Sequence, residues 1–255
     1  ASAVRFARAK SLLNASLASA APVSILKPLT GADPEMYESF RSHCLQDYPE
    51  YEIIFGVSDD NDSAIALVQR LQDEFPQRAI RLLYCREVLG ANIKVSNLAQ
   101  MLRQAQFECV LVNDSDIRVP ANYLRQIVPP LHEENVALVT CLYRGVAAPT
   151  LGSRLESVGI STDFAPGVLA AHLLEGGLHF GLGSTLEFRK ADLASIGGFE
   201  SLGDYLADDY ELGRRLATAG RKVKLSHTVV ETLLPAYSLA GYIRHQLRWA
   251  RTIRD

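Results

Sequence analysis

The chain has 255 residues, of which 48% are hydrophobic and 22% charged, and this composition excludes a disordered or fibrous protein. The length suits one large α/β domain, and no uninterrupted apolar stretch reaches the roughly 18 residues of a membrane-spanning helix. The formal net charge of −3 is uneven, because residues 1–20 and 241–255 each carry +3 and the stretch between them carries −9. An acidic body argues against a nucleic-acid partner and fits a protein that recruits a cation, with basic ends that suit an anionic lipid surface.

None of the four cysteines has zinc-clamp spacing, and three of them lie in apolar, strand-like runs. We therefore expect buried free thiols, which are typical of a reducing cytoplasmic compartment. The Ala-rich start has neither an initiator Met nor a signal peptide, so we expect the chain to be part of a longer protein.

The first half of the chain alternates strand and helix signals. Apolar runs predict strands at 23–26, 51–57, 79–85 and 108–113. Helical periodicity occurs between them at 34–46, 62–75 and 94–105. The first of these helices is predicted to have Asp33 as its N-cap and Pro34 at its first position. This alternation predicts a mostly parallel central sheet flanked by helices on both faces.

The second half is less regular, with four glycines between 176 and 183. Its patterns predict helices at 120–131, 150–175, 190–196, 207–219 and 238–254. The strands predicted there are 136–142, 185–188, 222–225 and 228–232. No hinge composition interrupts the chain, so a single domain is favoured.

Two acidic clusters directly follow predicted strands. Asp59 and Asp62 follow 51–57, and Asp114 and Asp116 form a D-x-D after 108–113. Ligands of open α/β sheets bind beyond the carboxyl ends of the strands. Neighbouring carboxylates suit Mg²⁺ or Mn²⁺ that a diphosphate also holds, although a turn with helix caps is an equally valid interpretation of a lone D-x-D.

A third acidic cluster, residues 207–211, opens a predicted helix. Its carboxylates fit either helix capping or a general base that takes the proton of a sugar-accepting hydroxyl. The last predicted helix is amphipathic, with a basic face formed by Arg244, Arg248 and Arg251. Such a helix is typical of a membrane interface, but its arginines and His245 also suit stabilisation of a departing diphosphate.

Taken in order, these motifs resemble the GT-A glycosyltransferases with a D, D, D, (Q/R)xxRW signature. The nearest resemblance is to the family-21 lipid glycosyltransferases, which include ceramide glucosyltransferases and bacterial hopanoid-biosynthesis enzymes. It runs from Val23 to Arg254 and rests on the segments 24–29, 46–49, 57–62, 92–98, 114–119, 183–184, 207–210 and 248–249. The hopanoid branch is nearer than the ceramide branch, on the segments 140–145, 161–164 and 248–254.

The resemblance implies a role for each acidic cluster. Asp62, with Asp59 beside it, would lie near the uracil and ribose. Asp114 and Asp116 would bind the metal, Mg²⁺ or Mn²⁺, and Asp114 also the diphosphate. Asp209 would be the catalytic base.

The resemblance also implies roles outside the acidic clusters. The (Q/R)xxRW element falls on residues 245–249, so Arg248 and Trp249 match it, whereas His245 replaces Gln or Arg and can still donate a hydrogen bond. Lys27 and Lys94 are candidates for nucleotide binding. The remaining matches, Gly183 and Ser184, fall on the loop beneath the donor sugar, where a missing side chain allows close approach.

The function implied is a metal-dependent, inverting transfer of glucose or N-acetylglucosamine from a UDP-sugar to a lipid hydroxyl of a hopanoid polyol or ceramide. The expected organisation is a juxtamembrane flank (1–21), a GT-A catalytic domain (22–235) and an amphipathic interface helix (236–255). The expected location is the cytoplasmic face of a bacterial inner membrane, with the transmembrane segments outside this chain. Three alternatives remain, namely a processive polysaccharide synthase, a non-catalytic nucleotide-sugar-binding module and a nucleotidyltransferase. The sequence lacks the glycine- and arginine-rich loop expected after the first strand of a nucleotidyltransferase, which counts against that alternative.

Overall fold

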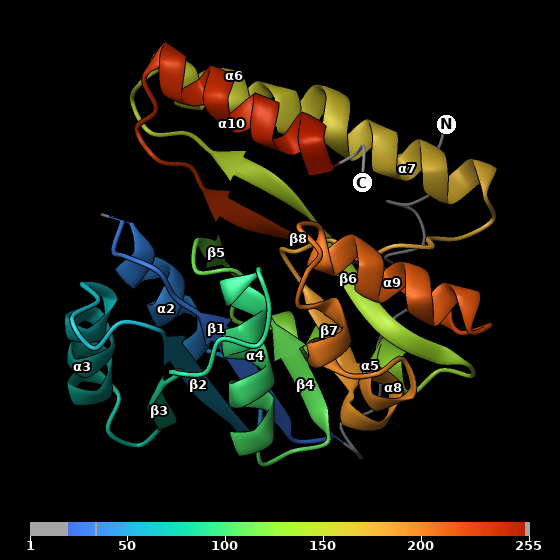
Figure 1. Ribbon diagram of the computed structural model, residues 1–255, viewed down its shortest axis with the longest axis horizontal. Coiled ribbons are helices and arrows are strands. Elements are labelled where there is room, and N and C mark those ends of the chain that lie inside the picture. Colours follow the sequence, from blue (N-terminus) through green and yellow to red (C-terminus); the bar gives the residue numbers. More distant parts are fainter. Residues whose placement is uncertain (1–19, 34, 253–255) are drawn as a thin grey trace.

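The computed structural model describes residues 20–33 and 35–252, with side chains up to residue 250 (Figure 1). Several predicted features lie outside this range, namely Pro34, nearly all of the 1–21 flank, the side chain of Arg251 and the end of the chain from residue 253. None of the described helices is long and apolar enough to cross a bilayer.

The described strands form one mixed sheet of order β3-β2-β1-β4-β7-β6-β8-β5. Their bounds are Val23–Pro28 (β1), Tyr51–Val57 (β2), Ala79–Tyr84 (β3), Cys109–Val112 (β4), Ile117–Arg118 (β5), Val136–Val146 (β6), Leu186–Arg189 (β7) and Lys222–Leu233 (β8). Four neighbouring pairs are parallel, and the three antiparallel pairs all involve β5 or β7. The predicted parallel sheet therefore holds for β1 to β4, and the second half adds the antiparallel strands.

Helices cover both faces of this sheet. One face packs against α2 (Met36–Cys44), α3 (Ala64–Glu74) and α5 (Tyr123–Leu131), and the other packs against α4 (Ile93–Gln104), α8 (Lys190–Ser195), η4 (Phe199–Leu202) and α9 (Asp208–Thr218). Strand β1 shows why, because Ile25 belongs to the first core and Leu26 to the second. Alternate side chains of a strand point to opposite faces, so the continuous apolar runs of β1, β2 and β4 are buried on both sides of the sheet, whereas the edge strand β3 is partly exposed.

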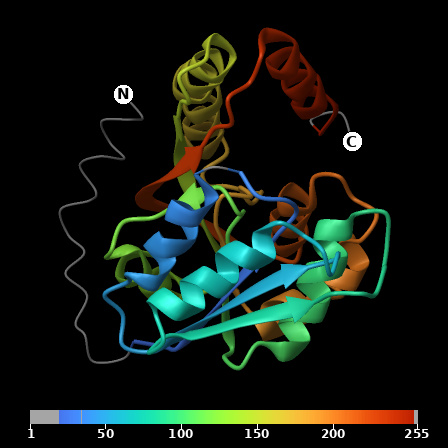
Figure 2. The ribbon, with the colours of Figure 1, turned by 90° about the vertical axis from the view of Figure 1, so that its left-hand side faces the viewer.

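Strands β6 and β8 form a long parallel ribbon that extends beyond β7 and is joined near its far end by the two-residue strand β5 (Figures 1 and 2). The far end of β6 leads into a helical rod that consists of α6 (Leu151–Gly159), the short π-helix η3 (Ile160–Phe164) and α7 (Ala165–Leu174). Strand β8 leads to α10 (Leu239–Thr252). Helices α6 and α10 contact each other above the sheet. We call this assembly of α6, η3, α7 and α10 the roof.

Two sequence predictions differ from the structure, and one strand was not predicted at all. The two strands predicted at 222–225 and 228–232 are one strand, because a bulge between Ser226 and Val229 absorbs the polar residues without ending the pairing with β6. Helix α2 begins at Met36 with Glu35 as its N-cap, so Asp33 does not cap it. Strand β5 was not predicted, because two residues carry no detectable alternation. The prediction of buried free thiols is confirmed for Cys85, Cys109 and Cys141, and Cys44 is buried and free as well.

Candidate active site

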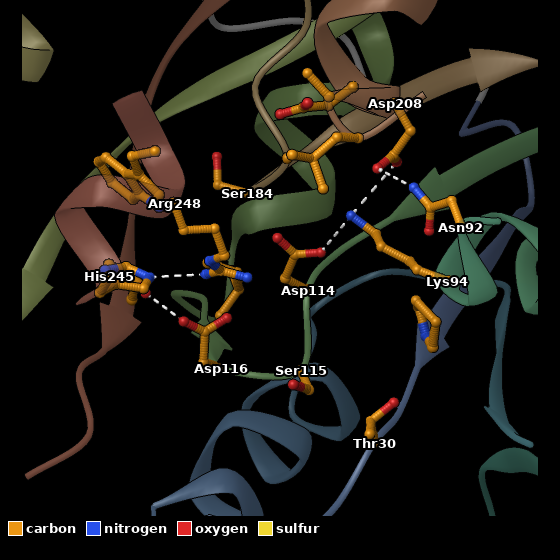
Figure 3. A pocket seen from close by; sticks show the side chains of 18 of the residues that line it. Thr30, Asn92, Lys94, Asp114, Ser115, Asp116, Ser184, Asp208, His245 and Arg248 are labelled. Carbon is orange, nitrogen blue, oxygen red and sulfur yellow. Dashed lines mark hydrogen bonds and ion pairs between the residues drawn. The ribbon is translucent and has the colours of Figure 1, made fainter. Parts of the chain in front are cut away.

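A cavity of about 910 Å³ lies between the carboxyl ends of β1 and β4, the start of α9 and the underside of the roof. It brings together most of the predicted site residues (Figure 3), and its lining includes Lys94, Asp114, Asp116, Gly183, Ser184, Asp208, Asp209, His245, Arg248 and Trp249. The three motifs of the second half, far apart in the sequence, therefore share one cavity with the D-x-D.

Asp114 stands at the centre of the charged floor of the cavity. The Nζ atom of Lys94, on the first turn of α4, lies 2.8 Å from Asp114 Oδ1 and 3.5 Å from Asp208 Oδ2. Burial alone would lower the pKa of Lys94, but the surrounding carboxylates raise it, so the ammonium is retained. The second D-x-D carboxyl, of Asp116, accepts a hydrogen bond from Thr232 Oγ1, and its pKa is raised by burial and by the charge of Asp114.

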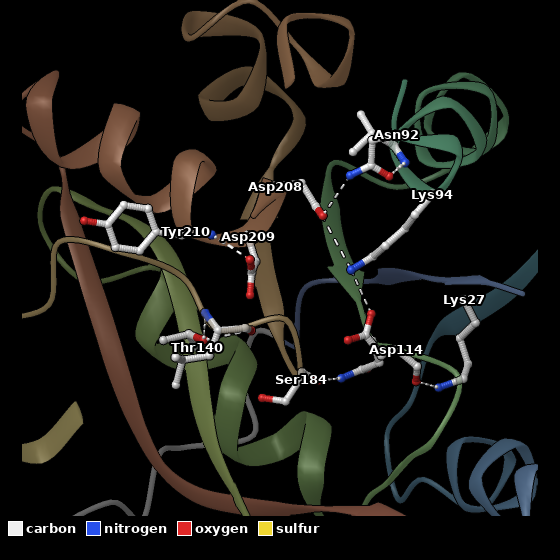
Figure 4. Close-up of polar contacts among 12 residues, drawn as sticks. Lys27, Asn92, Lys94, Asp114, Thr140, Ser184, Asp208, Asp209 and Tyr210 are labelled. Atoms are coloured by element: carbon white, nitrogen blue, oxygen red, sulfur yellow. Dashed lines mark hydrogen bonds and ion pairs between the residues drawn. The ribbon is translucent and has the colours of Figure 1, made fainter. Parts of the chain in front are cut away.

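Lys27 lies beneath the D-x-D and is not among the residues that line the cavity (Figure 4). Its side chain is fully buried, and Nζ donates a 2.9 Å hydrogen bond to the backbone carbonyl of Asp114. Burial lowers the pKa of Lys27 to about 7. The contact holds the D-x-D turn from below.

Asn113 is a site residue that the sequence reasoning missed. Its side chain is fully buried, and Nδ2 donates to the Ser184 carbonyl at 2.6 Å and to Tyr123 Oη at 3.0 Å. The bond to Ser184 joins the D-x-D turn to the loop that contains Gly183. A polar residue between an apolar strand and a D-x-D was the signal that could have revealed it.

Asp208 and Asp209 occupy the first turn of α9 but have different partners (Figure 4). Asp208 accepts a 3.2 Å bond from Asn92 Nδ2 and pairs with Lys94. Asp209 Oδ1 accepts a 2.8 Å hydrogen bond from the backbone N–H of Tyr210. Burial, with the charge of Asp208, raises the pKa of Asp209 to about 6.

Gly183 leaves a gap between two carboxylates. A methyl group at this position would lie 3.0 Å from Asp209 Oδ2 and 3.2 Å from Asp114 Oδ2. The two carboxylates therefore approach the same space above bare backbone, which is open to a ligand only because position 183 has no side chain.

Helix α10 supplies the other side of the cavity. The Nη2 atom of Arg248 lies 2.8 Å from His245 Nε2 (Figure 3), and the Trp249 ring packs against the rings of His245 and Phe164. Arg244 is exposed and is not one of the residues that line the cavity.

Asp59 and Asp62 are not in the described lining of the cavity. Asp62 accepts hydrogen bonds from the backbone N–H groups of Gly31 and Ala64, at 2.9 Å and 2.8 Å. Asp62 thereby fixes the loop after β1, whose Thr30 and Asp33 do line the cavity. Asp59 is exposed and accepts from the N–H of Asn61.

No three His, Cys, Asp or Glu side chains of the described part of the chain converge closely enough to hold a metal ion by themselves. The D-x-D nevertheless presents the carboxyl groups of Asp114 and Asp116 to the cavity, and carboxylate oxygens are the ligands that Mg²⁺ and Mn²⁺ prefer. A hard divalent ion fits this site if a diphosphate supplies part of its coordination.

Known proteins similar to this chain are glycosyltransferases. Over 230 residues, 90% of this chain and 50% of the relative, it is 28% identical to ceramide glucosyltransferase 3 of Caenorhabditis elegans. It also matches the ceramide glucosyltransferase of Komagataella phaffii, with 33% identity over 43% of this chain and 22% of the relative. The chain spans about half the length of the nematode relatives or less.

The fold is that of solved GT-A enzymes. A mannosyltransferase of Pyrobaculum calidifontis in complex with GDP-Man and Mn²⁺ superimposes with a TM-score of 0.68 and 23% identity, over 100% of this chain and 72% of that one. GalNAc-T7 with UDP, GalNAc and Mn²⁺ superimposes with a TM-score of 0.62 and 10% identity, over 84% of this chain and 43% of that one. The sequence model of glycosyltransferase family 21 matches residues 2–255, and the chain therefore belongs to glycosyltransferase family 21.

Proposed function

We propose that this chain is the catalytic part of an inverting transferase that moves a hexose from a UDP-sugar to the hydroxyl of a membrane lipid. The observation that carries the proposal is the approach of Asp114 and Asp209 to one gap above Gly183. One carboxylate suits the donor diphosphate and its metal ion, and the other suits the acceptor hydroxyl. The ceramide glucosyltransferases among the relatives support a lipid acceptor.

Asp209 is the proposed general base. An alcohol has a high pKa, so a carboxylate must take its proton as the oxygen attacks the anomeric carbon. Asp209 is suited to this task, because its pKa of about 6 keeps it ionised at neutral pH and makes it more basic than an ordinary Asp. Attack on the face opposite UDP inverts the anomeric centre without a covalent sugar–enzyme intermediate.

The departing UDP needs positive charge near its diphosphate. Asp114 and Asp116 are the proposed holders of Mg²⁺ or Mn²⁺, which when bound would neutralise charge on the diphosphate oxygens. Arg248 from the roof and Lys94 from the floor supply cationic side chains on two sides of the same cavity. Lys27, buried beneath Asp114, acts on the D-x-D turn rather than on the nucleotide.

The sugar is glucose or N-acetylglucosamine, and the acceptor is a hopanoid polyol or a ceramide. Both donors are UDP-sugars, and both acceptors are apolar molecules with a hydroxyl. This pairing agrees with a cavity whose lining combines charged groups with Leu206, Tyr143 and Trp249.

The roof is the proposed contact with the membrane, at the cytoplasmic face of a bacterial inner membrane. Helix α10 exposes Leu239, Ile243 and Leu247 at four-residue spacing. The rod beside it exposes Leu151, Leu155, Val158, Leu173 and Leu174. Exposed apolar residues at helical spacing on adjoining helices suit a lipid interface. The contribution of the basic ends to this contact rests mostly on residues outside the described range.

The test is to incubate membranes that carry the enzyme with isotope-labelled UDP-glucose and UDP-N-acetylglucosamine and to analyse the lipids by mass spectrometry. One labelled hexose on a hopanoid or sphingolipid is the expected product, and it should be absent with Asp209→Asn. A sugar polymer would indicate a processive synthase. Tight UDP binding without any product or UDP release would indicate a binding module.

A further inference from the structure

A buried carboxylate on the roof helix α6 faces α10, the helix that carries His245 and Arg248. The side chain of Glu156 is only 1% exposed, and it lines the cavity. Its Oε1 lies 3.0 Å from His245 Nδ1, and its Oε2 accepts a 2.9 Å hydrogen bond from Gln246 Nε2. Both of these partners are on α10, so the carboxylate connects α6 to α10.

The contact between Arg248 and His245 determines which ring nitrogen of His245 carries the proton. Arg248 Nη2 is 2.8 Å from His245 Nε2, and a guanidinium can only donate. The Nε2 atom must therefore be the acceptor, which requires a neutral imidazole with its proton on Nδ1. That proton points at Glu156, whose carboxylate can only accept.

The orientation of the His245 ring is fixed separately. The ring stacks on Tyr237 with centroids 5.3 Å apart and an interplanar angle of 26°. The Trp249 ring contacts it at 5.3 Å. With the ring held by these neighbours, the remaining variable is its protonation state, and Glu156 favours the Nδ1–H form.

We propose that Glu156 is a positioning residue. Its carboxylate holds His245 in the Nδ1–H tautomer, whose Nε2 then orients the guanidinium of Arg248 toward the cavity. The inference rests on the proposed function, in which Arg248 faces the departing diphosphate. It also gives a role to the histidine that replaces Gln or Arg, since one side of the ring contacts Arg248 and the other is held by α6.

The tautomer can be measured directly in the unmodified chain. Long-range proton–nitrogen NMR correlation, with His245 assigned through the spectrum of His245→Gln, should show Nδ1 protonated and Nε2 bare at neutral pH. A ring protonated on Nε2, or on both nitrogens, would overturn the inference. It would leave the proposed function untouched, because that depends on Asp209 and on the product assay.

Three variants test the consequence for activity. Glu156→Leu removes the acceptor and should lower kcat by about 10-fold or more, as loss of a carboxylate behind a functional histidine does, with a smaller change in donor KM. Glu156→Gln keeps an acceptor oxygen if Gln246 turns its amide, and should restore most of kcat together with the Nδ1–H signal. Gln246→Leu breaks the other α6–α10 bond and is the matched control.

The pattern among these variants separates positioning from a structural role. The inference predicts a near-normal kcat for Gln246→Leu and the Nε2–H tautomer for Glu156→Leu. Equal losses of kcat in Glu156→Leu and Gln246→Leu would mean that the carboxylate only docks α10. An unchanged tautomer and kcat in folded Glu156→Leu would also reject the inference.

Discussion

At the scale of single residues, neighbouring carboxylates have different environments. Asp208 is neutralised by Lys94 and bound by Asn92, whereas Asp209 lies against the gap at Gly183. A base must be free to bond the acceptor hydroxyl, and only Asp209 has that freedom. The structure thus separates two residues that the sequence presents as one cluster.

The first prediction compares the two corresponding amides. Asp209→Asn should lower kcat at least about 100-fold, because removal of a general base costs that much. Asp208→Asn keeps a side chain that can bond Asn92 and should lower kcat about 10-fold or less. Steady-state rates of UDP release measure both variants. A reversed order would assign the base to Asp208.

The second prediction concerns pH. Burial raises the pKa of Asp209 to about 6, so the carboxylate is ionised above that value and protonated below it. The value of kcat/KM, which reports on the free enzyme, should be level above pH 6 and fall about tenfold per unit below it. A profile that stays level down to pH 5 would contradict the assignment.

Residue identity could be predicted from the sequence better than residue environment. The D-x-D, Lys94, Asp209 and Arg248 follow recognisable motifs and do line the cavity. The burial of Lys27 was not predictable, because a lysine after a strand looks the same whether it faces solvent or a backbone carbonyl. The sequence likewise does not indicate that the Asp62 carboxylate accepts a hydrogen bond from the backbone of another loop.

At the scale of elements, close backbone contact attaches α9 to the loop before β7. A methyl group at Gly213 would lie 2.2 Å from the backbone nitrogen of Gly181. Neither backbone can yield, so the glycine is what allows the helix that carries Asp209 to pack against the loop that carries Gly183. The packing of α9 against this loop sets the distance between Asp209 and the gap above Gly183.

The third prediction compares two helical glycines. Gly213→Ala should destabilise the fold by about 1–3 kcal/mol through this overlap and should lower kcat by separating Asp209 from Gly183. Gly167→Ala, in α7, meets nothing within 4 Å and should stabilise the fold by about 0.5–1 kcal/mol. Urea unfolding of both variants provides the comparison. An unchanged free energy of unfolding and an unchanged kcat in Gly213→Ala would contradict this packing argument.

The elements of the first half matched their predicted ranges within about two residues, because β1, β2 and β4 are buried on both faces and therefore appear as continuous apolar runs. Later elements departed from their prediction because the two-residue strand β5 carries no detectable alternation and because a bulge keeps β8 continuous. The partner of His245 was beyond sequence reasoning, since Glu156 lies 89 residues away on another helix.

At the scale of the whole molecule, the proposed membrane contact and the cavity share the roof. The same helices that expose Leu155 and Leu247 also present Glu156, His245 and Arg248 to the cavity. A lipid acceptor that leaves the bilayer beside the roof would therefore have a short path to Asp209.

The fourth prediction tests this orientation with vesicles of anionic phospholipid. Leu155→Glu and Leu247→Glu should each reduce the fraction of protein that sediments with the vesicles, because each puts a charge on the proposed apolar surface. The control is Val88→Glu, at an exposed valine outside the roof. Equal reductions in all three variants would argue against a specific membrane-facing surface.

The long β6–β8 ribbon has a consequence for how the molecule opens. Between β7 and the roof, the two-residue strand β5 is the one described strand that pairs with the β6–β8 ribbon, and a ribbon with so few neighbours is less stable than a wider sheet. The roof should therefore open as a local unit while β1 to β4 stay closed. In hydrogen–deuterium exchange, we expect the amides of 147–174 and 239–250 to exchange faster than those of the central strands, and binding of UDP should slow them by holding Arg248. Uniform exchange across both regions would show that the roof and the sheet open together.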